Sequence, residues 1–138
     1  MFERFKLGKK FLNADRTAAH VAPLFRTCMC PALKSFDPLD PRLKSDQFVV
    51  GYIYGATAVW SLRHEDQQEK GFLIQQVFER LFPDEGRTLT ETCTQWARQK
   101  NAEFVRAGGL GYKEMIEAVD SEGQKSLRGL MDHIRENY

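Results

Sequence analysis

The sequence lacks the charge imbalance that marks most proteins that bind nucleic acid. Its 138 residues contain 20 Lys and Arg against 19 Asp and Glu, which gives a formal net charge of +1. Proteins that bind DNA or RNA usually need a basic surplus to neutralise phosphates. Because only the first ten residues are locally basic, the composition disfavours nucleic acid as a partner.

Cysteine is scarce, and its spacing shows no disulfide pattern. Cys28, Cys30 and Cys93 are odd in number, and the N-terminus has no apolar stretch typical of a secretory signal. We therefore expect reduced thiols and a cytoplasmic location. A zinc site needs four ligands, usually in two pairs, and the pair Cys28 and Cys30 has no second pair. The sequence predicts no metal site and no cofactor.

Long hydrophobic runs are also missing. The longest one, from Phe48 to Leu62, is shorter than the ~20 apolar residues that a membrane-spanning helix requires. It contains Thr57 and Ser61 and has charged residues on both sides. The run therefore predicts a buried helix over about residues 47–64 rather than a membrane span.

No segment shows the alternating pattern of a half-buried strand, whereas helical spacing recurs along the chain. The sequence predicts an all-α fold, an irregular bundle of five or six helices around the buried central helix at about 47–64. Residues 1–13 are interpreted as an amphipathic N-terminal arm, and residues 14–138 as a single helical domain.

Capping and turn residues predict where several helices begin and end. Asp15 is a candidate cap for a helix that runs to about Met29, and Pro23 predicts a kink or a break within it. A further helix is expected over about 66–82. Asp46 or Ser45 is expected to cap the central helix.

Two further predictions rest on short patterns in the second half of the chain. Thr88–Glu91 and Ser121–Gln124 both fit the capping box, in which a hydroxyl and a residue three positions later satisfy each other's backbone amides. They predict helices over about 88–107 and 122–136. Gly108 and Gly109 predict the stop between the first of these and a short helix at 112–119.

Small residues in the central helix form a stripe. Gly51, Gly55 and Ala58 lie at i, i+4 and i+7, so they share one side of the helix. Each Gly costs about 1 kcal/mol in a helix relative to Ala. Two such residues indicate that another helix packs closely there, either from the same chain or from a second copy.

No catalytic or cofactor motif stands out, and the three histidines share no ligand or triad spacing. The leading hypothesis is a non-enzymatic protein-interaction module or adaptor that forms a homodimer. The alternative is a helix bundle that holds a small apolar or aromatic ligand in an aromatic-lined pocket. Aromatic residues with polar tips are the candidate ligand or partner contacts. They are Tyr52, Tyr54, Trp60 and Trp96.

Overall fold

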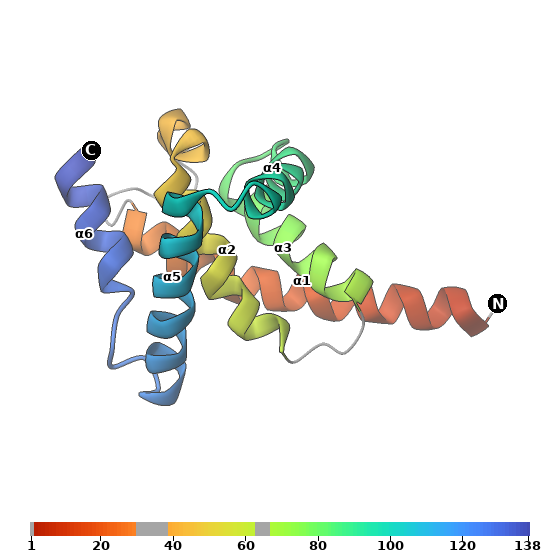
Figure 1. Ribbon diagram of the computed structural model, residues 1–138. Helices are drawn as coiled ribbons and strands as arrows, with labels where there is room; N and C mark the ends of the chain where they lie inside the picture. The colour runs from red at the N-terminus through yellow and green to blue at the C-terminus, as the bar shows by residue number, and fades with distance from the viewer. Residues whose placement is uncertain (1, 30–38, 63–66) are drawn as a thin grey trace.

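Six α-helices and one short 3₁₀ helix make up most of the computed structural model (Figure 1). It describes the backbone of residues 2–29, 39–62 and 67–138, and their side chains from residue 12 onward. No strand occurs in these ranges, so the predicted all-α fold is confirmed. The elements are α1 (Phe2–Met29), η1 (Pro41–Ser45), α2 (Gln47–Ser61), α3 (Gln67–Leu81), α4 (Gly86–Arg98), α5 (Ala102–Asp120) and α6 (Arg128–Asn137).

The central helix of the bundle is α2, as the apolar run predicts. The Asp46 carboxylate caps it by accepting hydrogen bonds from the backbone N–H groups of Phe48 and Val49, at 2.9 and 3.2 Å. Most residues of α2 are buried, and a helix that is apolar on all sides must be surrounded by others. In Figure 1, α5 crosses α2 in the foreground and α1 runs behind.

The crossing of α2 and α5 is the most extensive helix contact of the fold. A Cβ atom placed on Gly51 would lie 2.6 Å from the carbonyl oxygen of Phe104, and one on Gly55 would overlap the carbonyl of Gly108. From the other side, a Cβ atom on Gly111 would overlap the carbonyl of Tyr52. The two backbones are thus in direct contact, within one chain.

This contact explains why two predicted helix boundaries are wrong. Gly108 and Gly109 do not stop a helix, since α5 continues through them from Ala102 to Asp120. Gly108 lies against α2 and serves helix packing instead, whereas a Cβ atom on Gly109 would meet nothing within 4 Å. The break lies earlier, where Lys100 has a left-handed φ of 53° and the Asn101 side chain accepts a hydrogen bond from the N–H of Phe104 at 3.0 Å.

The first helix is longer than predicted. α1 is continuous from Phe2 to Met29, so no helix begins at Asp15 and the proline does not divide the helix in two. Pro23 lies on an exposed side of α1, where water can satisfy the carbonyl that its missing N–H leaves free. Residues 2–13, predicted as an arm, are the N-terminal part of α1, and in Figure 1 the first turns extend past α3.

Neither predicted capping box forms. α4 begins at Gly86, where Glu79 of α3 accepts hydrogen bonds from the N–H groups of Asp84 and Gly86 at 2.7 and 2.9 Å. α6 begins only at Arg128, and there Glu114 of α5 accepts the N–H of Gly129 at 2.7 Å. In both places a carboxylate from the preceding helix performs the capping expected of a local hydroxyl.

Candidate ligand-binding groove

An apolar groove of about 580 Å³ lies where α1, the C-terminal end of α2, the C-terminal half of α5 and the 121–127 turn meet. Leu24 of α1, Trp60 of α2 and Met115 of α5 line it. Leu127 closes one end. Because these residues come from four separate segments, no local sequence pattern could have assembled them.

Helical spacing brings the lining residues onto one side of each helix. His20, Leu24 and Thr27 follow one another at i, i+4 and i+7 on α1, and Met115 and Val119 are four apart on α5. The turn that closes the groove bends sharply, with left-handed φ values of 55° at Glu122 and 85° at Gly123. This bend is what carries the chain from α5 back to the end of the groove.

The floor of the groove is uncharged. Cys28 is a free, half-buried thiol there. Burial raises the pKa of Cys28 to about 11, and the nearby charge of Glu114 adds to the rise, although a backbone hydrogen bond at Leu127 opposes it. The thiol is therefore protonated at neutral pH. The charged lining residues Glu122 and Lys125 are both exposed and belong to the turn.

The predicted aromatic contacts are divided among three places. Trp60 lines the groove and meets the edge of the His20 ring, with 5.2 Å between the ring centroids. Tyr54 and Trp96 both pack on Phe104 instead, at 5.5 and 5.8 Å. Tyr52 is fully buried in the α2–α5 contact. Among the lining residues named for the groove, Trp60 is the sole member of the predicted set.

Tyr52 and the predicted small residues have structural positions. The Tyr52 hydroxyl donates a hydrogen bond of 2.6 Å to Glu114. Gly51 and Gly55 lie against α5, whereas Ala58 is half-buried. Burial raises the pKa of Tyr52, and the Glu114 bond raises it further, so the phenol remains a donor.

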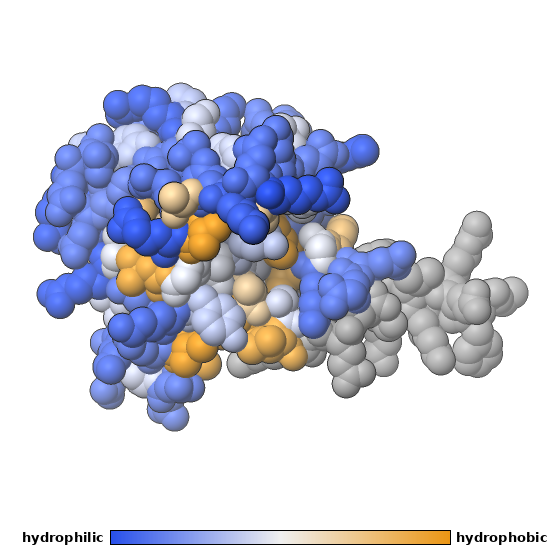
Figure 2. All heavy atoms as spheres, in the orientation of Figure 1, coloured by the Kyte–Doolittle hydropathy of each residue, from blue (hydrophilic) through white to orange (hydrophobic). Residues whose placement is uncertain are grey.

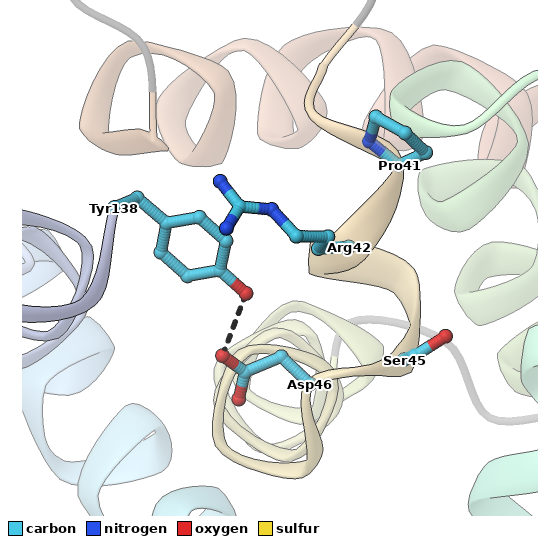
Figure 3. Close-up of a pocket in the computed structure, with 5 residues that line it drawn as sticks. All are labelled: Pro41, Arg42, Ser45, Asp46 and Tyr138. Carbon is cyan, nitrogen blue, oxygen red and sulfur yellow. Dashed lines mark hydrogen bonds between the residues drawn. The ribbon is translucent and has the colours of Figure 1, made fainter.

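A second, polar site surrounds Asp46, at the N-terminal end of α2 (Figure 3). Besides capping α2, the Asp46 carboxylate contacts His133 Nε2 at 2.8 Å and accepts the Tyr138 hydroxyl at 2.9 Å. Arg42 lies over the Tyr138 ring, 4.8 Å from its centroid. In Figure 3 the Ser45 hydroxyl points away from Asp46, so Ser45 is not oriented as a nucleophile toward the carboxylate–imidazole pair.

The Asp46 cluster fastens α6 to the start of α2. The cap is predictable from the sequence, whereas the link to His133 is not, because His133 lies 87 positions away. Burial raises the pKa of Asp46, but hydrogen bonds from His133, Tyr138 and the backbone of Val49 outweigh it, so the net pKa lies below its usual value. The carboxylate is therefore more stable in the folded protein than in the unfolded chain.

We expect Asp46→Ala to destabilise the protein by about 1–2 kcal/mol at pH 7, the range for a lost cap. A folded pKa below the unfolded one adds stability above the unfolded value, near 3.9 for Asp, and this stability is lost as pH falls through the folded pKa. The variant should therefore lose less stability than the parent between pH 5 and pH 2. Urea unfolding at several pH values measures both effects, and parallel pH curves would contradict the assignment.

Metal-binding clusters and membrane-spanning helices are both absent from the residues that the structure describes. Among residues 2–29, 39–62 and 67–138, no group of three or more His, Cys, Asp or Glu side chains could hold a metal ion. Cys30 and His64 lie outside the described residues. No helix in the described part of the chain is long and apolar enough to cross a membrane.

Comparisons of the chain with protein-family models, with curated proteins and with solved structures find no match. The geometry of the groove and of the exposed surfaces is therefore the basis for inferring function.

Proposed function

We propose that the protein is a non-enzymatic binding protein whose groove takes a small molecule with an apolar body and a polar head. The main support for this proposal is the apolar, uncharged floor of the groove beside Trp60. The groove has a volume of about 580 Å³, which is within the usual range for small-molecule sites, and such sites are mostly apolar with a few polar groups that fix orientation. The proposal keeps Trp60 as a ligand contact and adds Leu24, Met115 and Leu127.

The rim indicates which kind of head group the site favours. Glu122, Lys125 and Ser126 stand together in the turn at one end of the groove. They offer one negative charge, one positive charge and one hydroxyl. A neutral or zwitterionic head suits this mixture better than a multiply charged one, because a like-charged rim residue would repel any strong single charge.

Fluorescence energy transfer can test ligand binding at this place. The chain has two Trp residues, so a Trp96→Phe variant keeps Trp60 as its sole Trp donor. N-phenyl-1-naphthylamine, a neutral apolar fluorophore, should quench Trp60 and gain fluorescence in proportion. The groove places any bound probe beside Trp60, so the transfer should saturate with probe concentration. A linear, unsaturable signal would mean partitioning without a site.

A groove-filling substitution provides the specific test. In the Trp96→Phe background, Ala118→Phe should weaken probe binding at least tenfold, because Ala118 lines the groove and a Phe ring would occupy its space. Ala102→Phe is the matched control, since Ala102 is an exposed residue of the same helix outside the groove. Equal binding by both variants, with unchanged helical circular dichroism, would overturn the proposed site.

A reducing, cytoplasmic location is part of the proposal. The thiols of Cys28 and Cys93 are both free in the structure, and Cys93 is fully buried. Burial raises the pKa of Cys93 to about 12, so this thiol is protonated and unreactive.

Association with another protein chain is the second candidate function. It is favoured by large apolar side chains that remain exposed on α5, among them Val105 and Tyr112. These residues lie on a different side of the helix from most of the groove lining. Ligand binding and association could therefore occur in the same molecule.

A further inference from the structure

We propose that a second copy of this chain docks antiparallel on the exposed side of α5. This inference specifies the partner and the surface of the second candidate function, and it does not depend on ligand binding in the groove, with which the surface shares only Val119. The contact surface is a set of five residues that we call the α5 stripe. They are Val105, Gly109, Tyr112, Ile116 and Val119.

Helix geometry places the α5 stripe on one side of the helix. Its members alternate at spacings of four and three, so they fall within an arc of about 80°. The opposite sides of α5 are already used, by α2 at Phe104 and Gly111 and by α6 at Leu110. The α5 stripe is therefore an additional apolar face beyond the one that the fold requires.

The α5 stripe is accessible. Val105, Tyr112 and Val119, each one heptad apart, are 55%, 37% and 36% exposed, so large apolar side chains recur on one accessible helix face. Gly109 is exposed and a Cβ atom there would meet nothing within 4 Å. Figure 2 shows hydrophobic and weakly polar side chains over α5 with hydrophilic ones around them.

Charges beside the α5 stripe favour an antiparallel second copy. One flank of the α5 stripe has four charged residues. The two positive ones, Arg106 and Lys113, come first along the helix, and the two negative ones, Glu117 and Asp120, follow. The N-terminal half of this flank is thus positive and the C-terminal half negative. Within the described residues, Arg106 forms an ion pair with Glu103 at 3.7 Å and its guanidinium lies 5.7 Å from the centroid of the Phe48 ring, whereas Glu117 and Asp120 form no ion pair.

A two-fold axis near Tyr112 matches these charges. Such an axis places the same flank of both helices side by side in opposite directions, so Arg106 of one copy lies between Glu117 and Asp120 of the other. Val105 then faces Val119, and Gly109 leaves room for Ile116. Lys113 lies near Lys113 of the second copy, and their repulsion is reduced by solvent and salt. In a parallel arrangement the charged flanks of the two copies would lie on opposite sides of the contact, so these ion pairs could not form.

The size of the contact indicates a reversible dimer. One helix of 19 residues is about 28 Å long, so the paired area is at the low end for protein interfaces, below about 1,200 Å². Contacts of that size are typical of transient association. We therefore expect a dissociation constant in the micromolar range, within reach of sedimentation velocity over protein concentrations of about 1–300 μM.

Charge reversal on the full chain tests both the surface and the orientation. Arg106→Glu should weaken dimerisation about tenfold or more, since it places like charges together twice in each dimer. Asp120→Arg alone should also weaken it, because it faces Arg106 of the other copy. Arg106→Glu combined with Asp120→Arg should restore most of the affinity. A monomeric parent at 300 μM would overturn the proposal, as would a double variant that is weaker than both single ones.

An apolar substitution with a matched control separates the surface from general hydrophobicity. Tyr112→Glu, at the axis, should abolish the dimer. Leu62→Glu should not, although Leu62 is 64% exposed, because it lies at the end of α2. Circular dichroism confirms that each variant is folded, and the N-phenyl-1-naphthylamine assay should be unaffected by Tyr112→Glu. A Tyr112→Glu protein that still dimerises would overturn the proposal and leave the groove unaffected.

Discussion

Gly55→Ala should destabilise the protein by about 3 kcal/mol or more, although Ala is the better helix former by about 1 kcal/mol. The added Cβ atom would overlap the backbone carbonyl of Gly108, and a backbone group cannot move aside as a flexible side chain can. Because the crossing lies within one chain, the variant should lose stability by urea unfolding with no change in molecular mass. This is the largest single-substitution effect that we expect.

The other glycines provide a graded set of controls. A Cβ atom on Gly71 would meet nothing within 4 Å, so Gly71→Ala should stabilise α3 by roughly 0.5–1 kcal/mol. On Gly108 it would make an ordinary contact at 3.4 Å, and on Gly51 a close one at 2.6 Å. Stability should therefore fall in the order Gly71→Ala, Gly108→Ala, Gly51→Ala, Gly55→Ala. A Gly55→Ala variant as stable as Gly71→Ala would disprove the close crossing.

The glycines also show which part of the fold could be read from the sequence. The spacing of Gly51 and Gly55 inside a long apolar run correctly indicated a helix, since no stop signal interrupted it. Gly108 and Gly109 lie in a more polar segment and were interpreted as a stop. Locally, a packing glycine and a capping glycine look the same. What distinguishes them is the facing helix, which is about fifty residues away in the chain.

The starts of the helices were likewise predictable only where the interacting groups are close together in the sequence. The Asp46 cap was predictable because the side chain and the amides it accepts are two and three residues apart. The Glu79 and Glu114 caps span 7 and 15 residues, and each depends on how two helices are placed. Local Ser and Thr patterns then suggested starts that tertiary contacts did not use. The hydroxyl of Thr90, for example, bonds back to the carbonyl of Gly86 within α4.

The candidate groove was harder to predict from the sequence than the fold. Trp60 could be selected for its size and polar tip. Leu24, Met115 and Leu127 could not, because each also fits the apolar spacing of an ordinary core residue. Large apolar residues that recur at heptad spacing on the polar side of a helix can indicate a contact surface, and Val105, Tyr112 and Val119 have this spacing. The pattern cannot be recognised when a helix stop is predicted at Gly108 and Gly109, because the three residues then belong to two separate helices.

Glu114→Leu should cost about 3 kcal/mol, the second largest effect that we expect. Its carboxylate oxygen accepts both the buried Tyr52 hydroxyl, at 2.6 Å, and the N–H of Gly129 at the start of α6, at 2.7 Å. A buried donor left without its partner costs about 1–3 kcal/mol, and a lost helix cap about 1 kcal/mol. Leu resembles Glu in size, so the packing change is small. Glu103→Leu, at an exposed position in the first turn of α5, is the matched control and should change stability by less than about 1 kcal/mol.

A double-mutant cycle that combines Tyr52→Phe with Glu114→Leu separates the stability contribution of the Tyr52 hydroxyl from that of the α6 cap. In the Tyr52→Phe background no buried hydroxyl remains to be satisfied, so Glu114→Leu should cost only the contribution of the α6 cap. The coupling between the two sites should therefore be about 1–2 kcal/mol, measured by urea unfolding of the parent, both single variants and the double variant. Additive losses would mean that the 2.6 Å contact contributes nothing to stability. Hydrogen exchange at the start of α6 should rise in both Glu114→Leu proteins and in neither of the others, because the cap is lost only there.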